Sequence, residues 1–267
     1  MPSAVAFAGS VPAMYDQYLG PFLFEPYAKD LVQRLPKGLH KVLEIACGTG
    51  RVTKHLVTTL AADGQLTATD LNPDMVTVAK QKVTDSRVIW SVADALQLPF
   101  NDDTFDAVVC QFGVMFFPDK AKAFAETHRV LKTGGRFLFN TWDSVDANTP
   151  VEIVDTVLKE EFGEAAPDFL KAAPYSFYDK ELIKDLLSKA GFKNCKLDVV
   201  SLKSSYATPD DIITGFLEGT PLFTYLAEKD AAKKEIVRRR IREQLTERFG
   251  ESSNHVPLQA IVCEGGK

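Results

Sequence analysis

Short apolar runs alternate with longer helical patterns over the first two thirds of the chain. Short runs rich in β-branched and aromatic side chains, bounded by turn residues, are typical of buried strands. They predict strands at residues 41–46, 65–70, 87–92, 105–110, 135–141, 192–200 and 258–263. Strands that alternate with helices form a parallel sheet with helices on both faces and right-handed crossovers. The pattern therefore predicts a doubly wound α/β fold.

The helices between the early strands carry start and stop signals. Asn72 followed by Pro73 is typical of an N-cap with proline at the first helical position. Asp119 is expected to cap a later helix, and Gly134 with Gly135 is expected to stop that helix and open the next strand.

Two segments do not fit the alternation. Residues 1–36 include the aromatic-rich stretch YDQYLGPFLFEPYAKDLV, and residues 207–252 have the pattern of two or three helices. Within the latter, the run KKEIVRRRIREQLTER is typical of a solvated helix face. We therefore expect an N-terminal helical cap at residues 1–36, a core at residues 37–206 and 253–267, and a helical insert at residues 207–252 that acts as a lid.

Composition narrows the function classes. The 267 residues are 45% hydrophobic and 25% charged, as in an ordinary globular protein. The 31 basic residues against 36 acidic ones give a net charge of −5, which disfavours nucleic acid as a partner. No stretch approaches the roughly 20 apolar residues needed to cross a bilayer, so we expect no membrane insertion. Four scattered cysteines without a CxxC pair indicate reduced thiols and predict a cytoplasmic protein.

The segment VLEIACGTG (residues 42–50) joins a strand to a glycine-containing turn that is expected to open a helix at residues 51–62. Such a turn lets the backbone approach a nucleoside cofactor closely. A dinucleotide fingerprint would have a third glycine where this chain has Thr53. Glu44 is also a poor neighbour for a pyrophosphate and a good one for a cation. Both features disfavour NAD.

Acidic residues end three consecutive predicted strands. Glu44 is followed after 26 residues by Asp70, and Asp94 follows the third strand. Ligands of open α/β sheets bind at the carboxyl ends of the strands, where a carboxylate can accept hydrogen bonds from ribose hydroxyls. The three acids therefore predict a nucleoside site at this edge.

These segments resemble the class I S-adenosylmethionine-dependent methyltransferases, in particular the small-molecule branch of ubiquinone/menaquinone biosynthesis. The resemblance covers roughly residues 38–142 and rests on the motifs VLEIACGTG, TDLNPDMV, ADALQLPFNDDTFDAVVCQFG and HRVLKTGGRFLFNTW. Ala46 departs from it, since many members carry glycine there. The resemblance implies a seven-stranded, mostly parallel sheet in the order 3214576 with strand 7 antiparallel.

The resemblance also implies S-adenosylmethionine as cofactor and S-adenosylhomocysteine as product. The implied cofactor-binding residues are Tyr15, Glu44, Ala46, Gly48, Gly50, Asp70, Leu71, Met75, Asp94, Ala95 and Gln111. Asp70 would bind the ribose, while Leu71 and Met75 flank the adenine. Asp94 and Ala95 would lie at the adenine edge, Gln111 beside the methionine moiety, and Tyr15 near the cofactor carboxylate.

The chemistry agrees with these residues. S-adenosylmethionine carries a sulfonium and an ammonium but no phosphate, so an acidic cavity suits it. Methyl transfer is an in-line displacement, and positioning alone can supply roughly 7–11 kcal/mol of the barrier. Such an enzyme needs a general base only if its acceptor must lose a proton.

The acceptor is expected to be a small, apolar or aromatic molecule. Methyltransferases that act on nucleic-acid amino groups carry an Asn/Asp-Pro-Pro-aromatic motif after the fourth strand, where this chain reads CQFGVMFFP. Phe116 and Phe117 are closer to the expected site, and they either contact the acceptor or belong to the core. The aromatic residues of the N-terminal cap and of the insert either form a lid over the acceptor or simply pack onto the core.

Histidine is the usual general base near neutral pH, and the chain has four, at His40, His55, His128 and His255. His128 shares a helix face with Phe124 and Leu131, which favours a position at the edge of the core. None of the four is assigned a catalytic role. Asp143 and Asn140 are too few for a metal site, so we expect no metal.

Two other function classes share parts of the pattern. A non-catalytic regulator would keep the cofactor site and bind without turnover. An NAD(P)-dependent oxidoreductase shares the fold and the ribose acid. This chain lacks the third glycine of the dinucleotide fingerprint. Its Tyr-x-x-x-Lys pair, Tyr225 and Lys229, lies in the insert and not beside the core strands, so it gives this class little support.

Overall fold

The computed structural model describes residues 11–204, 208–251 and 256–267. Within them, seven strands form one sheet in the order β3-β2-β1-β4-β5-β7-β6. The strands are β1 (Leu39–Ile45), β2 (Leu60–Asp70), β3 (Val88–Val92), β4 (Phe105–Gln111), β5 (Leu131–Trp142), β6 (Lys193–Lys203) and β7 (Pro257–Gly266). β7 runs antiparallel to both of its neighbours, and the other pairings are parallel. The predicted order and the antiparallel last strand are confirmed.

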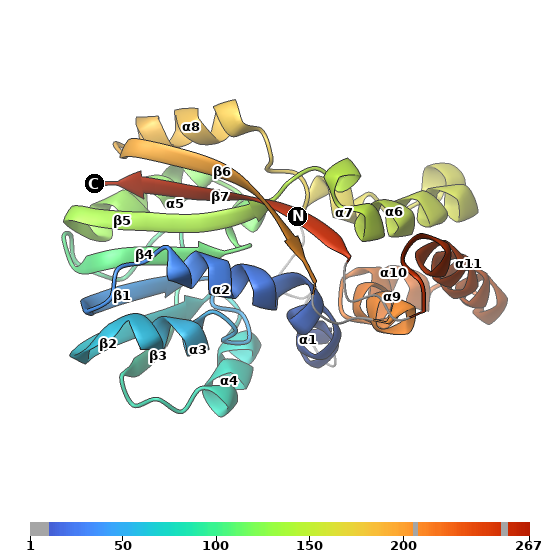
Figure 1. Ribbon diagram of the computed structural model, residues 1–267, viewed down its shortest axis with the longest axis horizontal. Coiled ribbons are helices and arrows are strands. Elements are labelled where there is room, and N and C mark those ends of the chain that lie inside the picture. Colours follow the sequence, from blue (N-terminus) through green and yellow to red (C-terminus); the bar gives the residue numbers. More distant parts are fainter. Residues whose placement is uncertain (1–10, 205–207, 252–255) are drawn as a thin grey trace.

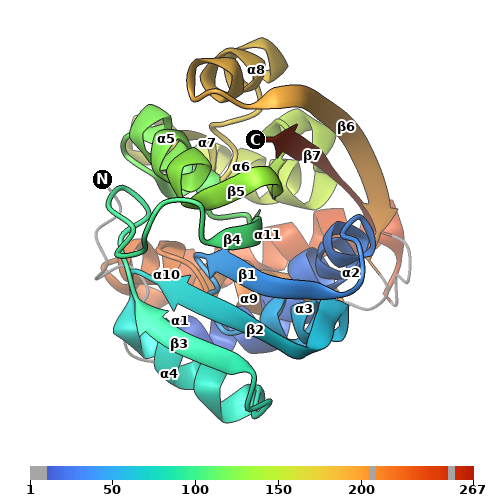
Figure 2. The same ribbon diagram turned by 90° about the vertical axis from the view of Figure 1, so that its left-hand side faces the viewer.

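Helices cover both faces of this sheet (Figure 2). α2 (Glu25–Gln33) and α3 (Thr53–Leu56) pack on one face through apolar residues such as Leu31 and Leu56. α5 (Lys120–Val130) and α8 (Lys180–Lys189) pack on the other, where Phe124 and Leu187 are fully buried. α4 (Pro73–Lys82) follows β2.

The predicted helix caps are present. The Asn72 side chain accepts a hydrogen bond from the backbone N–H of Asp74 at 2.9 Å, and Asp119 accepts one from that of Lys122 at 2.9 Å. These side-chain oxygens satisfy N–H groups that the first helical turn leaves unpaired. Both helices therefore begin where the sequence indicates.

The helix predicted at residues 51–62 is wrong in length. α3 ends at Leu56 and is followed by a single 3₁₀ turn, η3 (Val57–Thr59). The hydroxyls of Thr58 and Thr59 donate to the carbonyls of His55 and Leu56, each at 2.7 Å. Such local bonds compete with helix hydrogen bonds, and β-branched residues are weak helix formers. The chain therefore leaves the helix early and starts β2 at Leu60.

The glycine pair also acts differently from the prediction. α5 ends at Val130 and β5 starts at once, so Gly134 and Gly135 lie inside β5. Gly134 has φ +82°, and the register between β4 and β5 shifts at this point. Glycine in a strand often marks such a bulge. The pair therefore shapes the strand and does not end the helix.

The remaining helices gather beyond the carboxyl ends of the parallel strands (Figure 1). They are α1 (Val11–Met14), η2 (Tyr15–Phe24), α6 (Thr149–Phe162), α7 (Phe169–Ala172), α9 (Pro209–Glu218), α10 (Leu222–Ala227) and α11 (Ala231–Phe249). η2 consists of wide, π-type turns and contains Pro21. α11 buries Val237, Ile241 and Leu245 and exposes charged positions between them. No helix among the described residues is long and apolar enough to cross a membrane.

Candidate functional site

A cavity of about 250 Å³ lies at the carboxyl ends of β1, β2, β3 and β4. Most of the cofactor residues predicted from the sequence line it, namely Tyr15, Ala46, Gly48, Asp70, Leu71, Met75, Asp94, Ala95 and Gln111. Residues without a predicted cofactor role also line it, among them Asn72, Leu96, Phe112, Gly113, Phe116, Phe117 and Pro118. Sequence positions far apart thus meet at the edge where open α/β sheets bind ligands.

The glycine turn forms one wall of the cavity. Gly48 has φ +54°, a conformation that side chains rarely adopt, and its N–H donates to Asp70 Oδ2 at 2.8 Å. A Cβ built at Gly48 would meet no atom within 4 Å. The backbone here is therefore open to a ligand.

Gly50 lies outside the cavity wall, although the resemblance implies a cofactor role for it. A Cβ at this position would lie 3.1 Å from Ala79 Cβ of α4. The absence of a side chain at Gly50 thus lets α4 pack closely against the turn.

Glu44 is also outside the wall. Its side chain is 1% exposed, and its Oε2 accepts a hydrogen bond from the Thr53 hydroxyl at 2.6 Å. Burial raises the pKa of this carboxyl to about 8, and the nearby charge of Asp70 adds to the effect. Glu44 therefore supports the turn from within the protein.

Two carboxylates do line the cavity. Asp70 accepts from the N–H groups of Gly48 and Asn72, each at 2.8 Å, and burial raises its pKa. Asp94 accepts from the Leu96 N–H at 2.8 Å. A carboxylate has about four acceptor sites, so both groups keep capacity for ligand hydroxyls or for a cation.

Aromatic residues form another part of the wall. Phe112 has φ +49° and is held by stacking on Trp142, with ring centroids 3.9 Å apart, and by donation of its N–H to Asn140 Oδ1 at 3.0 Å. A Cβ on the adjacent Gly113 would lie only 2.6 Å from Ala46 Cβ. Sequence reasoning missed Phe112 and Gly113, although they directly follow Gln111.

None of the described histidines lines the cavity. His40 pairs with Asp63 at 3.1 Å, His55 contacts Glu25 at 2.9 Å, and His128 packs edge-on against the Phe192 ring. His255 lies outside the described residues.

The two residues weighed for a metal site make other contacts. The Asp143 carboxylate accepts from Gln259 Nε2 at 2.9 Å, and Asn140 accepts from the Phe112 N–H. The described part of the chain contains no group of three or more side chains able to hold a metal ion.

Comparison with known proteins adds to this geometry. The family profile described as "Methyltransferase domain" matches residues 43–139. The chain is 32% identical over 184 residues to the ubiquinone/menaquinone biosynthesis C-methyltransferase UbiE of Idiomarina loihiensis, which covers 62% of this chain and 73% of that protein. It is 44% identical over 103 residues to the protein of the same name from Saccharophagus degradans, covering 37% of this chain and 41% of that protein.

A solved structure supports the fold. Phosphoethanolamine N-methyltransferase 2 of Haemonchus contortus, in complex with S-adenosyl-L-methionine, matches with a TM-score of 0.61 at 18% identity, covering 96% of this chain and 56% of that chain. The resemblance seen in the motifs is thus confirmed. The chain belongs to the class I S-adenosylmethionine-dependent methyltransferases, in their UbiE-like branch.

Proposed function

We propose that this methyltransferase binds S-adenosylmethionine in the cavity at the sheet edge and transfers its methyl group to a small, apolar or aromatic acceptor. One observation carries the proposal: a single cavity combines the carboxylates of Asp70 and Asp94 with the aromatic side chains of Phe112, Phe116 and Phe117. Carboxylates suit a cationic nucleoside, and an aromatic wall suits an apolar partner.

The cofactor side fits its ligand. Asp70 keeps acceptor capacity for ribose hydroxyls, while Leu71, Met75 and Ala95 offer apolar surface to a base. The open backbone at Gly48 leaves room beside the turn. When bound, S-adenosylmethionine supplies a methyl group already activated by a sulfonium.

The acceptor side is built by the loop after β4. Phe116 and Phe117 come from this loop, and Phe116 is 37% exposed. Lys120 fixes the loop, because its Nζ donates to the carbonyls of Met115 and Phe117 at 3.1 and 3.0 Å. The names of the two relatives indicate C-methylation in ubiquinone/menaquinone biosynthesis, and an aromatic acceptor agrees with this wall.

The chain contributes positioning more than proton transfer. Among the described lining residues, the titratable side chains are those of Tyr15, Asp70 and Asp94. Burial raises the pKa of Tyr15 above its usual value, so its hydroxyl stays protonated. We therefore expect an acceptor whose reacting atom is already activated, such as a ring carbon made electron-rich by an ionised hydroxyl, and whose displaced proton leaves to solvent after the methyl transfer.

A calorimetric titration with S-adenosylhomocysteine, with NAD and NADP as controls, tests the cofactor. Micromolar binding of the product and none of the nicotinamides is the expected result. A screen of aromatic and aliphatic acceptors with labelled S-adenosylmethionine then tests transfer. Binding without transfer to any acceptor would favour a regulatory protein, and binding of NAD alone would overturn the proposal.

The Asp70→Asn variant tests the site itself. We expect it to bind S-adenosylhomocysteine about 10–100-fold more weakly, because charge-assisted hydrogen bonds contribute about 1.5–3 kcal/mol. Asp63→Asn is the matched control, since Asp63 is an exposed acid paired with His40 at the start of β1. Equal affinity of the Asp70→Asn variant and the wild type would place the cofactor elsewhere.

A further inference from the structure

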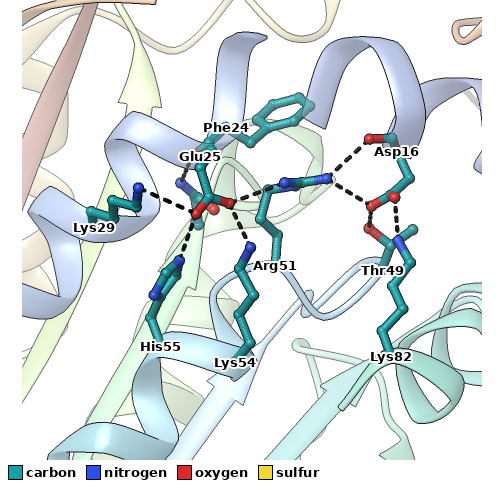
Figure 3. Close-up of polar contacts among 10 residues, drawn as sticks. Asp16, Phe24, Glu25, Lys29, Thr49, Arg51, Lys54, His55 and Lys82 are labelled. Atoms are coloured by element: carbon teal, nitrogen blue, oxygen red, sulfur yellow. Dashed lines mark hydrogen bonds and ion pairs between the residues drawn. The ribbon is translucent and has the colours of Figure 1, made fainter. Parts of the chain in front are cut away.

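Residues 15–33, here called the N-terminal segment, comprise η2 and α2 and are fastened to the glycine turn by polar contacts (Figure 3). Asp16 Oδ1 accepts from the Thr49 hydroxyl at 2.5 Å and from Arg51 Nη2 at 3.1 Å. The other oxygen of Asp16 pairs with Lys82 of α4. One carboxylate of the segment thus binds both the glycine turn and α4.

Arg51 makes the second half of this connection. Its Nη2 also donates to the Asp16 carbonyl at 3.0 Å, and its Nη1 donates to Glu25 Oε2 at 3.0 Å. The guanidinium lies against Gly20, where any side chain would collide with it. One arginine from the turn therefore contacts the segment at three points, which Figure 3 shows in part.

The central side chains of these contacts are largely, though not fully, removed from water. The side chains of Asp16, Arg51 and Glu25 are 17%, 17% and 18% exposed. Ion pairs on the open surface contribute little, whereas a partly buried network is screened much less. Glu25 also accepts from Lys54 at 2.8 Å and contacts His55 at 2.9 Å.

Both ends of this connection directly follow residues that line the cavity. Tyr15 directly precedes Asp16 and lines the cavity, while Gly48 directly precedes Thr49 and lines it too. Gln111, also in the wall, donates from Nε2 to the Phe24 carbonyl at 2.9 Å. The groups that hold the segment therefore belong to the same turn and strand that form the cavity.

We propose that Asp16 and Arg51 are positioning residues for the cofactor: they hold Tyr15 over the cavity and couple cofactor binding to docking of the N-terminal segment. The inference rests on the proposed function, which places the cofactor in this cavity. Cofactor binding and docking of the N-terminal segment both order the glycine turn, so each event lowers the entropy cost of the other. By linkage, the effect has the same size in both directions.

The experiment is a double-mutant cycle on the affinity for S-adenosylhomocysteine in the full chain. The variants are Asp16→Asn, Arg51→Gln and the two combined. The control is Arg239→Gln, which removes an exposed pair with Glu243 within α11. We expect each single variant to bind about tenfold more weakly. The double variant should lose clearly less than the sum of the two single losses, because the two side chains share one contact, the pair of Asp16 Oδ1 with Arg51 Nη2. The control should match the wild type.

A purely structural role would lower the melting temperature and leave the affinity of the folded protein unchanged, and that result would overturn the inference. Fully additive losses in the double variant would overturn it as well. If Arg51→Gln does not fold, Arg51→Lys takes its place, since lysine keeps the positive charge. We expect the affinity of Arg51→Lys for S-adenosylhomocysteine to lie between those of the wild type and Asp16→Asn. No binding by the wild type would overturn the proposed function, and this inference with it.

Discussion

Ala46 and Phe112 are both non-glycine residues with positive φ, at +55° and +49°, and both line the cavity. A side chain in this conformation costs roughly 1–2 kcal/mol, and such strain persists only where the surroundings enforce it. Stacking on Trp142 and the bond to Asn140 enforce it at Phe112. The cavity wall thus contains two residues with strained backbone in addition to the glycine turn.

The resemblance implies glycine in many family members at the position of Ala46, and the positive φ of Ala46 makes this departure testable. We expect Ala46→Gly to raise the free energy of unfolding by up to about 1 kcal/mol, because relief of strain exceeds the added flexibility of the unfolded chain. Urea denaturation measures the change. Ala68→Gly is the control, since Ala68 is buried in the middle of β2 and has no positive φ. An equal loss of stability in both variants would contradict the inference that the backbone of Ala46 is strained.

Glu44 should make the stability of the ligand-free protein depend on pH. Burial raises its pKa from 4.5 to about 8, so between these values the folded state holds more protons than the unfolded one. Stability must therefore fall as the pH rises through this window. We expect Glu44→Gln to remove about 5 kcal/mol of this fall, at 1.36 kcal/mol per pKa unit.

Urea denaturation of wild type and Glu44→Gln at several values between about pH 5 and pH 9 reports on this carboxyl, because titrations that do not depend on Glu44 cancel in the difference. Glutamine still offers an oxygen to the Thr53 hydroxyl, which keeps the local packing. Parallel pH profiles of the two proteins would show that Glu44 is ionised at neutral pH.

At the scale of elements, the strands follow from the sequence and the helix beside the site does not. Apolar periodicity places every strand of the core, and Asn72 and Asp119 cap their helices as predicted. The helix after the turn is short because threonine hydroxyls compete for its carbonyls, which apolar periodicity does not report. Motif position likewise does not tell which residues of the motif face the cavity, as Glu44 at the end of β1 and Gly50 in the turn show.

The N-terminal segment illustrates a further limit. Its aromatic, amphipathic pattern predicts helix, and the structure has helical turns there, but those of η2 are wide and include Pro21. Gly20 makes room for Arg51, a contact between residues 31 positions apart. No local pattern encodes such a contact, so the network around Asp16 was not predicted.

α9 packs against the N-terminal segment, and two glycines make this testable: Gly215 within α9 and Gly219 directly after it. A Cβ at Gly219 would lie 2.8 Å from the Tyr15 backbone nitrogen, whereas one at Gly215 would meet the flexible end of the Leu19 side chain first. We expect Gly219→Ala to lose about 1–3 kcal/mol of stability, as overpacking does, and to weaken S-adenosylhomocysteine binding through Tyr15.

Gly215→Ala, one turn earlier and within α9, is the matched comparison. Alanine gains about 1 kcal/mol of helix propensity there, which offsets the shift of Leu19. We expect this variant to be close to wild type in both urea denaturation and ligand titration. If both variants bind S-adenosylhomocysteine as the wild type does, α9 does not position Tyr15.

At the scale of the whole molecule, one hydrophobic cluster runs from the sheet into the added helices. It contains Leu43 and Phe139 of the sheet, Phe22 of η2, Phe216 of α9 and Leu245 of α11. The helices beyond the strand ends are therefore packed as part of the same core. A ligand bound at the sheet edge should therefore also stabilise the helices of this cluster, since the N-terminal segment contacts both the glycine turn and α9.

Amide hydrogen exchange tests this expectation. S-adenosylhomocysteine at 100 times its dissociation constant should add about 2.7 kcal/mol to the free energy of unfolding. Beyond this global effect, amide exchange through local opening should slow in η2 and α9, because the ligand orders these helices through the glycine turn and Tyr15. α8 packs on α5 and β6 at the far edge of the sheet, and exchange governed by its local opening should not change.

Protection confined to the strand ends and the glycine turn would mean that the added helices do not respond to the cofactor. Protection that spreads to η2 and α9 would instead show that the cavity is completed by segments far outside the methyltransferase motifs.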